Sequence, residues 1–174
     1  MKLKTLEGTD TRPTSERTKE AVFSAIQFEL HDRKVLDLFG GSGQMALEAL
    51  SRGAEKAVIV DNSRAACEII KENASKTGLM KQCRVVFSDW NEYLRGVSGR
   101  EKFSLVFLDP PYEEGIIDKV FKKLRDCDVL DRDAIVIAET GREGVPEPVE
   151  GYNHKIYRYG KSYISIIRNA ESGD

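Results

Sequence analysis

Five short apolar stretches alternate with longer segments of helical periodicity, and this alternation is the strongest constraint on how the chain can fold. The expected strands comprise residues 34–39, 56–61, 84–88, 103–108 and 134–139. The expected helices comprise residues 15–30, a segment that follows the first strand and stops at Gly53, and residues 63–78, 91–97 and 116–124. Strands that alternate with helices form a parallel sheet with right-handed crossovers. The sequence therefore predicts an α/β fold.

The last part of the chain has a different pattern. Beyond a polar loop at 141–151, residues 154–159 and 162–168 flank Gly160 and Lys161 and have the composition of an antiparallel hairpin. The sequence contains no internal repeat and no stretch that resembles an interdomain linker. We therefore expect residues 1–174 to form a single domain, in which residues 1–14 are an extended entry to the first helix.

Composition limits the classes of partner. The chain has 27 basic and 29 acidic residues, a formal net charge of −2, which argues against non-specific binding of nucleic acid over the whole surface. The first residues have no secretory signal core and no apolar run approaches a membrane span, so we expect a cytoplasmic protein. The cysteines lack zinc spacing and a disulfide framework, and we expect buried or half-buried thiols at Cys67, Cys83 and Cys127.

A glycine-rich loop follows the first expected strand. Its sequence is Gly40-Gly41-Ser42-Gly43, and Asp61 ends the next strand about twenty residues later, which is the arrangement for gripping a ribose diol with a carboxylate. Residues 41–46 also fit GxGxxA, so a domain that binds an NAD-type dinucleotide is an alternative. The other alternative is a loop whose glycines serve only a tight turn.

Further carboxylates follow the other strands. Asp37 is an ionisable residue at the end of an otherwise apolar strand, which suits hydrogen bonding to the loop and its ligand. Asp89 follows the third strand and could accept a hydrogen bond from an adenine amino group, with Trp90 as a wall for the ring. For Asp89, a helix N-cap is an equally good interpretation.

The fourth strand stops at Asp109-Pro110-Pro111-Tyr112. The two prolines have no backbone N–H to donate to a neighbouring strand, so the sheet pairing cannot continue through them. Asp109 and the backbone carbonyls beside the prolines are acceptors for an amine, and Tyr112 offers a stacking surface. Together they would receive a planar ring that carries an NH2 group. Alone, the same tetrapeptide could be a simple turn with a solvated Asp and a packing Tyr.

In combination, these motifs resemble class I S-adenosylmethionine-dependent methyltransferases that modify exocyclic amines. The resemblance implies S-adenosylmethionine as the cofactor and a catalytic turn formed by Asp109, Pro110, Pro111 and Tyr112. It implies ten cofactor-binding residues: Asp37, Phe39, Gly40, Gly41, Ser42, Gly43, Asp61, Asn62, Asp89 and Trp90.

A narrower resemblance rests on upstream residues. Leu3-Lys4-Thr5-Leu6, Thr11-Arg12-Pro13-Thr14, Arg17, Lys19-Glu20 and Phe23, followed by DLFGGSG and later by Glu139, are similar to the bacterial family that methylates guanine N2 in 16S ribosomal RNA, the ribosomal small subunit methyltransferase D type.

This family resemblance implies a doubly wound, seven-stranded, mostly parallel sheet in which the C-terminal hairpin supplies the last two strands. It also implies contacts from Arg12, Arg17 and Lys19 to 16S ribosomal RNA, naked or within the small subunit. The family's basic N-terminal extension is missing before Met1, so we expect weaker RNA affinity. We further expect a monomer with no metal and no membrane partner.

Other functions remain open. Within methyltransferases, an adenine-N6 enzyme or a protein-amide enzyme would use a similar turn. An NAD-dependent oxidoreductase would explain the glycine loop and Asp61 but would leave Asp109 to Tyr112 without a role. A non-catalytic RNA-binding factor would keep the fold and lose methyl transfer.

Overall fold

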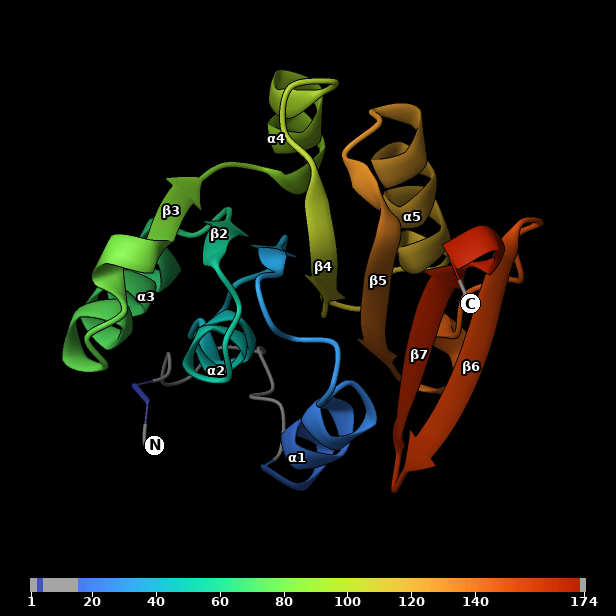
Figure 1. Ribbon diagram of the computed structural model, residues 1–174, viewed down its shortest axis with the longest axis horizontal. Helices are drawn as coiled ribbons and strands as arrows, with labels where there is room; N and C mark the ends of the chain where they lie inside the picture. Colours follow the sequence, from blue (N-terminus) through green and yellow to red (C-terminus); the bar gives the residue numbers. More distant parts are fainter. Residues whose placement is uncertain (1–2, 5–15, 173–174) are drawn as a thin grey trace.

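The computed structural model describes residues 3–4 and 16–172. Seven strands form one sheet in the order β3-β2-β1-β4-β5-β7-β6 (Figure 1). The strands are β1 (Lys34–Asp37), β2 (Lys56–Asp61), β3 (Cys83–Phe87), β4 (Phe103–Leu108), β5 (Leu130–Thr140), β6 (Tyr152–Tyr159) and β7 (Ser162–Asn169). β1 to β5 are parallel, whereas β7 runs antiparallel to both β5 and β6. The predicted seven-stranded, mostly parallel fold is confirmed.

Helices cover both faces of the sheet. They are α1 (Glu16–Ala25), α2 (Gln44–Ser51), α3 (Arg64–Lys76), α4 (Trp90–Val97) and α5 (Ile116–Asp126), with short 3-10 turns η1 (Met80–Gln82), η2 (Arg142–Gly144) and η3 (Ala170–Ser172). Buried residues of α1, α2 and α3 form one apolar core with the sheet, and those of α4 and α5 form the other. Figure 1 shows these two groups of helices on opposite sides of the strands.

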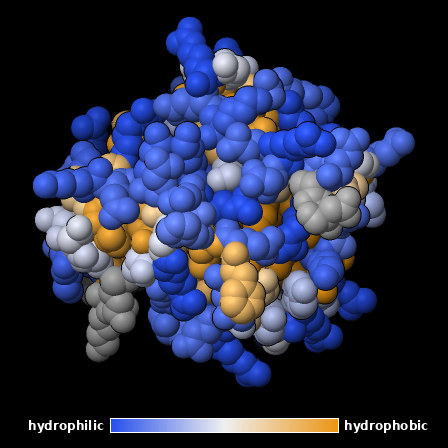
Figure 2. Space-filling model, viewed as in Figure 1, coloured by the Kyte–Doolittle hydropathy of each residue, from blue (hydrophilic) through white to orange (hydrophobic). Residues whose placement is uncertain are grey.

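β4 illustrates why the sequence specifies this double layer. All six of its residues are buried, and its apolar side chains from Leu105 to Leu108 alternate between the two cores. Leu105 and Phe107 pack with the first core, whereas Val106 and Leu108 pack with the second. A strand that is covered on both faces needs a continuous apolar run, because neither face meets water. The molecular surface in Figure 2, by contrast, is mainly hydrophilic, with apolar atoms visible in recesses between polar side chains.

The first helix and the first strand end earlier than the sequence predicted. The helix predicted to reach residue 30 ends at Ala25, because the Glu29 N–H bonds the carbonyl of Ile26 in a tighter turn and Arg33 Nε donates to the Glu29 carbonyl at 2.6 Å. The first strand ends at Asp37 and not at residue 39. There the Asp37 carboxylate accepts the Phe39 N–H at 3.1 Å, so a side chain replaces the next ladder bond.

The fifth strand and the hairpin are longer than predicted. β5 begins at Leu130, four residues before the expected start, and its register with β4 shifts between Phe103 and Leu105. The hairpin turn is correct: Gly160 has a φ of 63°, which suits glycine at the first central position of a two-residue turn.

Two of the cysteines, Cys67 and Cys127, are buried and Cys83 is half-buried, all as free thiols, which confirms the expectation for them. Within residues 3–4 and 16–172, every helix is too short or too polar to cross a bilayer.

A buried ion pair joins α1 to α2. The Lys19 side chain is only 6% exposed, and its Nζ lies 3.2 Å from Glu16 and 3.3 Å from Glu48. Burial tends to raise the pKa of Glu48, but hydrogen bonds from Ser51 and Lys19, together with the Lys19 charge, outweigh it and lower that pKa. Lys19 is therefore a structural cation that fixes α1 against the helix following the glycine loop.

We predict that Lys19→Met lowers the free energy of unfolding by about 1–3 kcal/mol, because it leaves Glu48 without one partner of a buried pair. The matched control is Arg17→Met, which removes an exposed cation from the same helix and should change stability by no more than about 0.5 kcal/mol. Urea unfolding of both variants measures the difference. Equal stabilities would show that the Lys19 pair does not anchor α1.

Candidate active site

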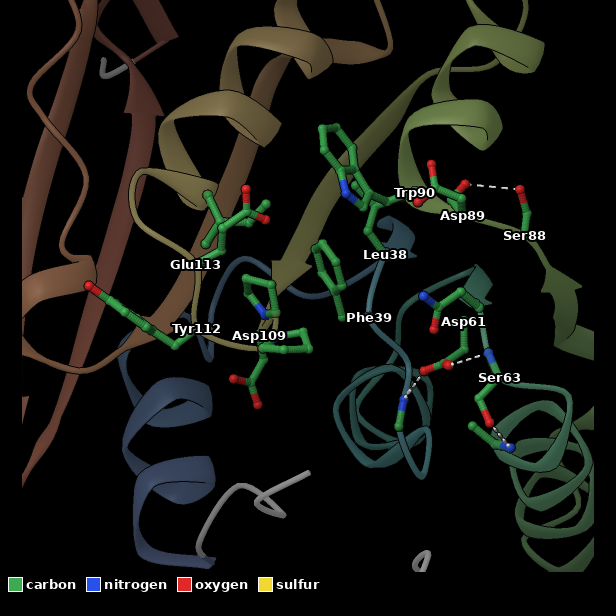
Figure 3. Close-up of a pocket in the computed structure, with 16 residues that line it drawn as sticks. Leu38, Phe39, Asp61, Ser63, Ser88, Asp89, Trp90, Asp109, Tyr112 and Glu113 are labelled. Carbon is green, nitrogen blue, oxygen red and sulfur yellow. Dashed lines mark hydrogen bonds between the residues drawn. The ribbon is translucent and has the colours of Figure 1, made fainter. Parts of the chain in front are cut away.

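A cavity of about 370 Å³ lies at the carboxyl ends of the parallel strands, near the point between β1 and β4 where the strand order reverses. Ligands of open α/β sheets bind at this place. Figure 3 shows its lining, with the Asp109 turn on one side and Asp61 and Ser63 on the other. The lining residues are Leu38, Phe39, Gly41, Asp61, Asn62, Ser63, Ala66, Ser88, Asp89, Trp90, Asp109, Pro110, Pro111, Tyr112, Glu113 and Ile116.

The glycine loop between β1 and α2 forms the floor of this region. Gly40 N donates to the Val60 carbonyl at 2.8 Å, and a Cβ on Gly40 would lie 2.5 Å from Ile59 Cγ2. Only glycine allows the loop to approach β2 so closely. Gly41 has a φ of 60° and open space where a Cβ would lie. Gly40 is thus a packing glycine, whereas Gly41 lines the cavity.

The carboxylate of Asp61 ties this loop to α3. One oxygen accepts the Gly41 N–H and the other accepts the Ser63 N–H, both at 2.9 Å. Ser63 is the N-cap of α3, as predicted, and its side chain accepts from the Ala66 N–H. Each carboxylate oxygen has two lone pairs, so Asp61 can still accept hydrogen bonds from a ligand diol in the cavity.

Asp37 lies behind the loop and outside the cavity lining. It is 3% exposed, and burial raises its pKa from 3.8 to about 7; the hydrogen bond from the Phe39 N–H opposes this rise, and the nearby charge of Asp61 adds to it. A carboxyl group that holds its proton near neutral pH can donate as well as accept a hydrogen bond. Asp37 therefore stabilises the start of the glycine loop from outside the cavity, by accepting the Phe39 N–H.

Asp89 is both a helix cap and a lining residue of the cavity. It is the N-cap of α4, and one carboxylate oxygen accepts the N–H groups of Asn91 and Glu92 at 2.9 and 3.2 Å. It also lines the cavity beside Trp90. The cap holds α4 in place, while the exposed carboxylate and the indole form the far wall (Figure 3).

β4 ends at Leu108, and all four residues of the Asp109 turn line the cavity. Tyr112 is 66% exposed, and its hydroxyl lies 3.5 Å from a carboxylate oxygen of Glu143. An exposed ring beside a carboxylate and a proline turn is available for stacking with a planar ligand. The turn thus presents the three chemical types that its sequence predicted.

The sequence-predicted residues divide into distinct groups. Ten of the fourteen cofactor and catalytic residues line the cavity; the four that do not are Asp37, Gly40, Ser42 and Gly43. Among the residues predicted to contact RNA, Arg17 is exposed on α1, Lys19 is buried in ion pairs, and Arg12 lies outside the described residues. The burial of Lys19 does not suit a phosphate contact.

Sequence reasoning missed Asn73, which is fully buried on α3. Its side-chain NH2 donates to the carbonyls of Ser42 and Lys4 at 2.8 and 3.0 Å, and its oxygen accepts the Lys4 N–H at 2.9 Å. Asn73 therefore joins the glycine loop to the start of the chain. A polar residue three positions after Ile70, on the inward face of the helix, was the available signal.

Comparison with known proteins identifies the family. Residues 1–168 match the family described as conserved hypothetical protein 95. The chain belongs to this family. It is 37% identical to "Putative rRNA methyltransferase YlbH" of Bacillus subtilis, over 84% of this chain and 81% of the relative. It is 33% identical to "Ribosomal RNA small subunit methyltransferase D" of Escherichia coli, over 78% of this chain and 67% of the relative.

Solved structures agree with this family assignment. "Putative methyltransferase yhhF" from Escherichia coli superimposes with a TM-score of 0.85 at 27% identity, covering 96% of this chain and 91% of that structure. An RNA methyltransferase from Salinibacter ruber in complex with S-adenosyl-L-homocysteine has the same fold, with a TM-score of 0.71 at 14% identity, 91% of this chain and 95% of that structure. The predicted resemblance and the class I methyltransferase fold are both confirmed.

The buried carboxyl of Asp37 predicts a pH effect on stability. In the unfolded chain Asp37 releases its proton near pH 4, whereas in the folded protein it keeps the proton up to about pH 7. Its contribution to stability therefore declines as pH rises from about 4 to about 7 and then stays constant. Asp37→Asn, which keeps an acceptor for the Phe39 N–H, should gain stability relative to the parent over this interval, as measured by urea unfolding at several pH values. A constant difference across that interval would contradict the raised pKa.

Removing the Asp61 carboxylate should weaken binding of S-adenosylmethionine. We predict a loss of about 1.5–3 kcal/mol for Asp61→Ala, or about 10- to 150-fold in affinity, because ligand hydroxyls and the Gly41 N–H lose a charged acceptor. Calorimetry measures this. Glu92→Ala, which removes an exposed carboxylate outside the cavity lining, is the control and should bind normally. Unchanged affinity in the Asp61 variant would remove this residue from the site.

Proposed function

We propose that this protein transfers a methyl group from S-adenosylmethionine to the exocyclic N2 amine of a guanine in 16S ribosomal RNA. The observation that carries the proposal is the position of the Asp109 turn between two cavities. Asp109, Pro110, Tyr112 and Ile116 line the 370 Å³ cavity and also a second cavity of about 140 Å³. A turn shared by two neighbouring cavities suits group transfer from a ligand in one to a ligand in the other.

The larger cavity fits the cofactor. Its volume lies within the usual range for small-ligand sites, about 300–1,000 Å³. Asp61 offers a carboxylate to a ribose diol, while Asp89 and Trp90 offer an acceptor and an aromatic wall to an adenine. Leu38, Phe39 and Ile116 supply apolar surface. S-adenosylmethionine would bring a sulfonium methyl group to this site, and the chain's own residues orient the acceptor towards it.

The smaller cavity fits a nucleobase edge. It lies between the Asp109 turn, the end of β5 and the tip of the β6–β7 hairpin, and its other lining residues include Glu139, Thr140 and Lys161. Thr140 Oγ1 is buried and has no hydrogen-bond partner among the described residues. A buried hydroxyl without a partner is costly unless a ligand satisfies it. A polar base beside the Tyr112 ring would do so, in the manner of bases turned out of a helix.

Methyl transfer in this arrangement needs few chemical groups. Asp109 and the Pro110 carbonyl accept the two N2 hydrogens, which localises the nitrogen lone pair that is otherwise delocalised into the ring. S-adenosylmethionine, held beside Asp61, Asp89 and Trp90, would supply the methyl group to N2, and the electron pair of the broken methyl–sulfur bond would stay on its sulfur. The N2 proton then leaves to solvent through Asp109. Holding both reactants in place can contribute on the order of 7–11 kcal/mol.

The relatives favour ribosomal RNA as the substrate class. The two that match over 78% and 84% of this chain are named as rRNA methyltransferases. Relatives with a different substrate match less of it: a release factor glutamine methyltransferase aligns with 55% of this chain. That match keeps a protein-amide acceptor as the alternative substrate.

Exposed Arg17 remains a candidate phosphate contact near the start of α1.

The identity of the acceptor is tested by product analysis. Labelled-methyl transfer onto unmodified small ribosomal subunits, naked 16S RNA and DNA in parallel should label RNA, alone or within the subunit, and nucleoside analysis should yield N2-methylguanosine. Detection of N6-methyladenosine, or of label in protein, would replace guanine N2 with the corresponding acceptor.

The role of Asp109 predicts a separation between binding and turnover. Asp109→Ala should lower the methyl-transfer rate by about 10²-fold or more, because the amine loses its charged acceptor, while cofactor affinity stays within about twofold. Glu114→Ala, an exposed carboxylate that lines neither cavity, is the matched control and should retain normal turnover. Near-normal turnover of the Asp109 variant would refute the proposed contact with the amine.

A further inference from the structure

A third cavity, of about 350 Å³, lies at the opposite edge of the sheet from the candidate active site. It is a groove across the amino ends of four adjacent strands, and its lining includes the first residue of each: Lys34, Lys56, Cys83 and Phe103. Figure 1 shows these strands side by side in the order β3-β2-β1-β4. We call this cavity the amino-end groove. Nothing in the proposed methyl transfer uses it.

The amino-end groove concentrates positive charge. Six of its lining residues are cations, whereas Glu101 is its one acidic lining residue among the residues that the structure describes. The cations are Lys34, Lys56, Lys81, Arg84, Arg100 and Lys102. The whole chain has a formal net charge of −2, so this groove departs strongly from the average surface. Clustered cations on one concave surface create a potential that attracts anions.

Most of this charge is not neutralised locally. Arg84 pairs with Glu101 at 3.3 Å, and Lys102 pairs with Asp128 at 2.7 Å. The other four cations, Lys34, Lys56, Lys81 and Arg100, lie beyond 4 Å of every acidic group in the described part of the chain.

Some exposed lysines elsewhere do have a carboxylate partner, since Lys122 on α5 pairs with Asp126 and Lys71 on α3 pairs with Glu68. Like charges without counter-ions repel one another, so their convergence calls for an anionic ligand.

We propose that the amino-end groove binds backbone phosphates of a second segment of the RNA substrate; this inference rests on the proposed function. Four strands spaced by about 4.8 Å span roughly 14 Å. A nucleic-acid strand carries a phosphate about every 3.4 Å along its axis, so on the order of four phosphates fit across the groove. Flexible lysines suit phosphates as point charges, and Arg100 can bind one with two parallel hydrogen bonds.

The position of the groove sets a length requirement. The six residues of β4 rise about 20 Å from the groove to the catalytic turn, at about 3.3 Å per residue. A short oligonucleotide that fills the active site therefore cannot reach the groove, whereas 16S RNA can contact both. This difference separates groove contacts from contacts at the catalytic end.

The experiment compares two triple variants with the same change in net charge. The test variant is Lys56→Gln, Lys81→Gln and Arg100→Gln, and the control is Lys71→Gln, Lys76→Gln and Lys122→Gln on α3 and α5. All six side chains are exposed, so both variants should fold. Affinity for 16S RNA and for a three-nucleotide fragment, which at about 3.4 Å per phosphate is shorter than the distance from the turn to the groove, is measured across a salt series, together with affinity for S-adenosylmethionine.

For 16S RNA, the test variant should reduce the slope of log K against log salt concentration by about 2 to 2.7, because each of three lost phosphate contacts removes about 0.7 to 0.9. Near 0.1 M salt, this change corresponds to a loss of about 10²-fold in affinity. Its binding of the short fragment and of the cofactor should match the parent. The control should show a much smaller change in steepness.

Other outcomes overturn the inference. Coincident 16S RNA curves for the test variant and the parent would show that the groove does not contact RNA. If calorimetry then found that the groove binds ATP, and that the test variant loses this binding, the groove would serve a soluble phosphate compound. Failure of the parent protein to bind or methylate any RNA would instead reject the proposed function, and the two failures are thereby distinguishable.

Discussion

The candidate site depends on one side chain, the carboxylate of Asp61 at the end of β2. It accepts the Gly41 N–H with one oxygen and the Ser63 N–H with the other, so it fixes the glycine loop and the start of α3 together. These segments belong to the consecutive strand-helix units β1–α2 and β2–α3. Because hydrogen bonds to a charged acceptor are stronger than neutral ones, a single residue can position both sides of this part of the cavity. Asp89, Trp90 and the Asp109 turn complete the cavity lining beside these two segments.

The glycine loop is also fixed by contacts that lie outside the cavity lining. Gly40 packs against Ile59 and Ile70 so closely that a Cβ would have to displace one of them. Asn73 adds three hydrogen bonds that join the loop carbonyl of Ser42 to the backbone of Lys4. A fully buried amide with both its donor hydrogens and its oxygen satisfied forms a stiff connection. The start of the chain is therefore mechanically linked to the loop, although the two segments are far apart in sequence.

The sequence was sufficient for the sheet, the hairpin and most of the cavity, because these depend on local patterns. Apolar runs flanked by turn residues located the strands, and the acidic residue at each strand end located the cavity. It was insufficient wherever partners are distant along the chain. Lys19 has the sequence context of a surface cation, and only the packing of α1 on α2 places it beside Glu48. The early end of α1 depends likewise on Arg33, whose guanidinium binds Glu29, Ser104 and Asp133 carbonyls.

The distribution of charge along the strand direction adds a physical constraint on any RNA substrate. Carboxylates gather at the carboxyl ends of the strands, at Asp61, Asp89 and Asp109, where on the proposed function they accept hydrogen bonds from the cofactor and the acceptor amine. The same carboxylates repel a polyanion that approaches this end of the sheet. Cations must offset this repulsion, and the amino-end groove holds four that have no local counter-ion among the described residues. On the proposed function, the anionic site of methyl transfer and the cationic site of RNA attachment lie at opposite ends of the strands. One small domain can therefore bind the RNA backbone and perform the chemistry without burying opposite charges in a single cavity.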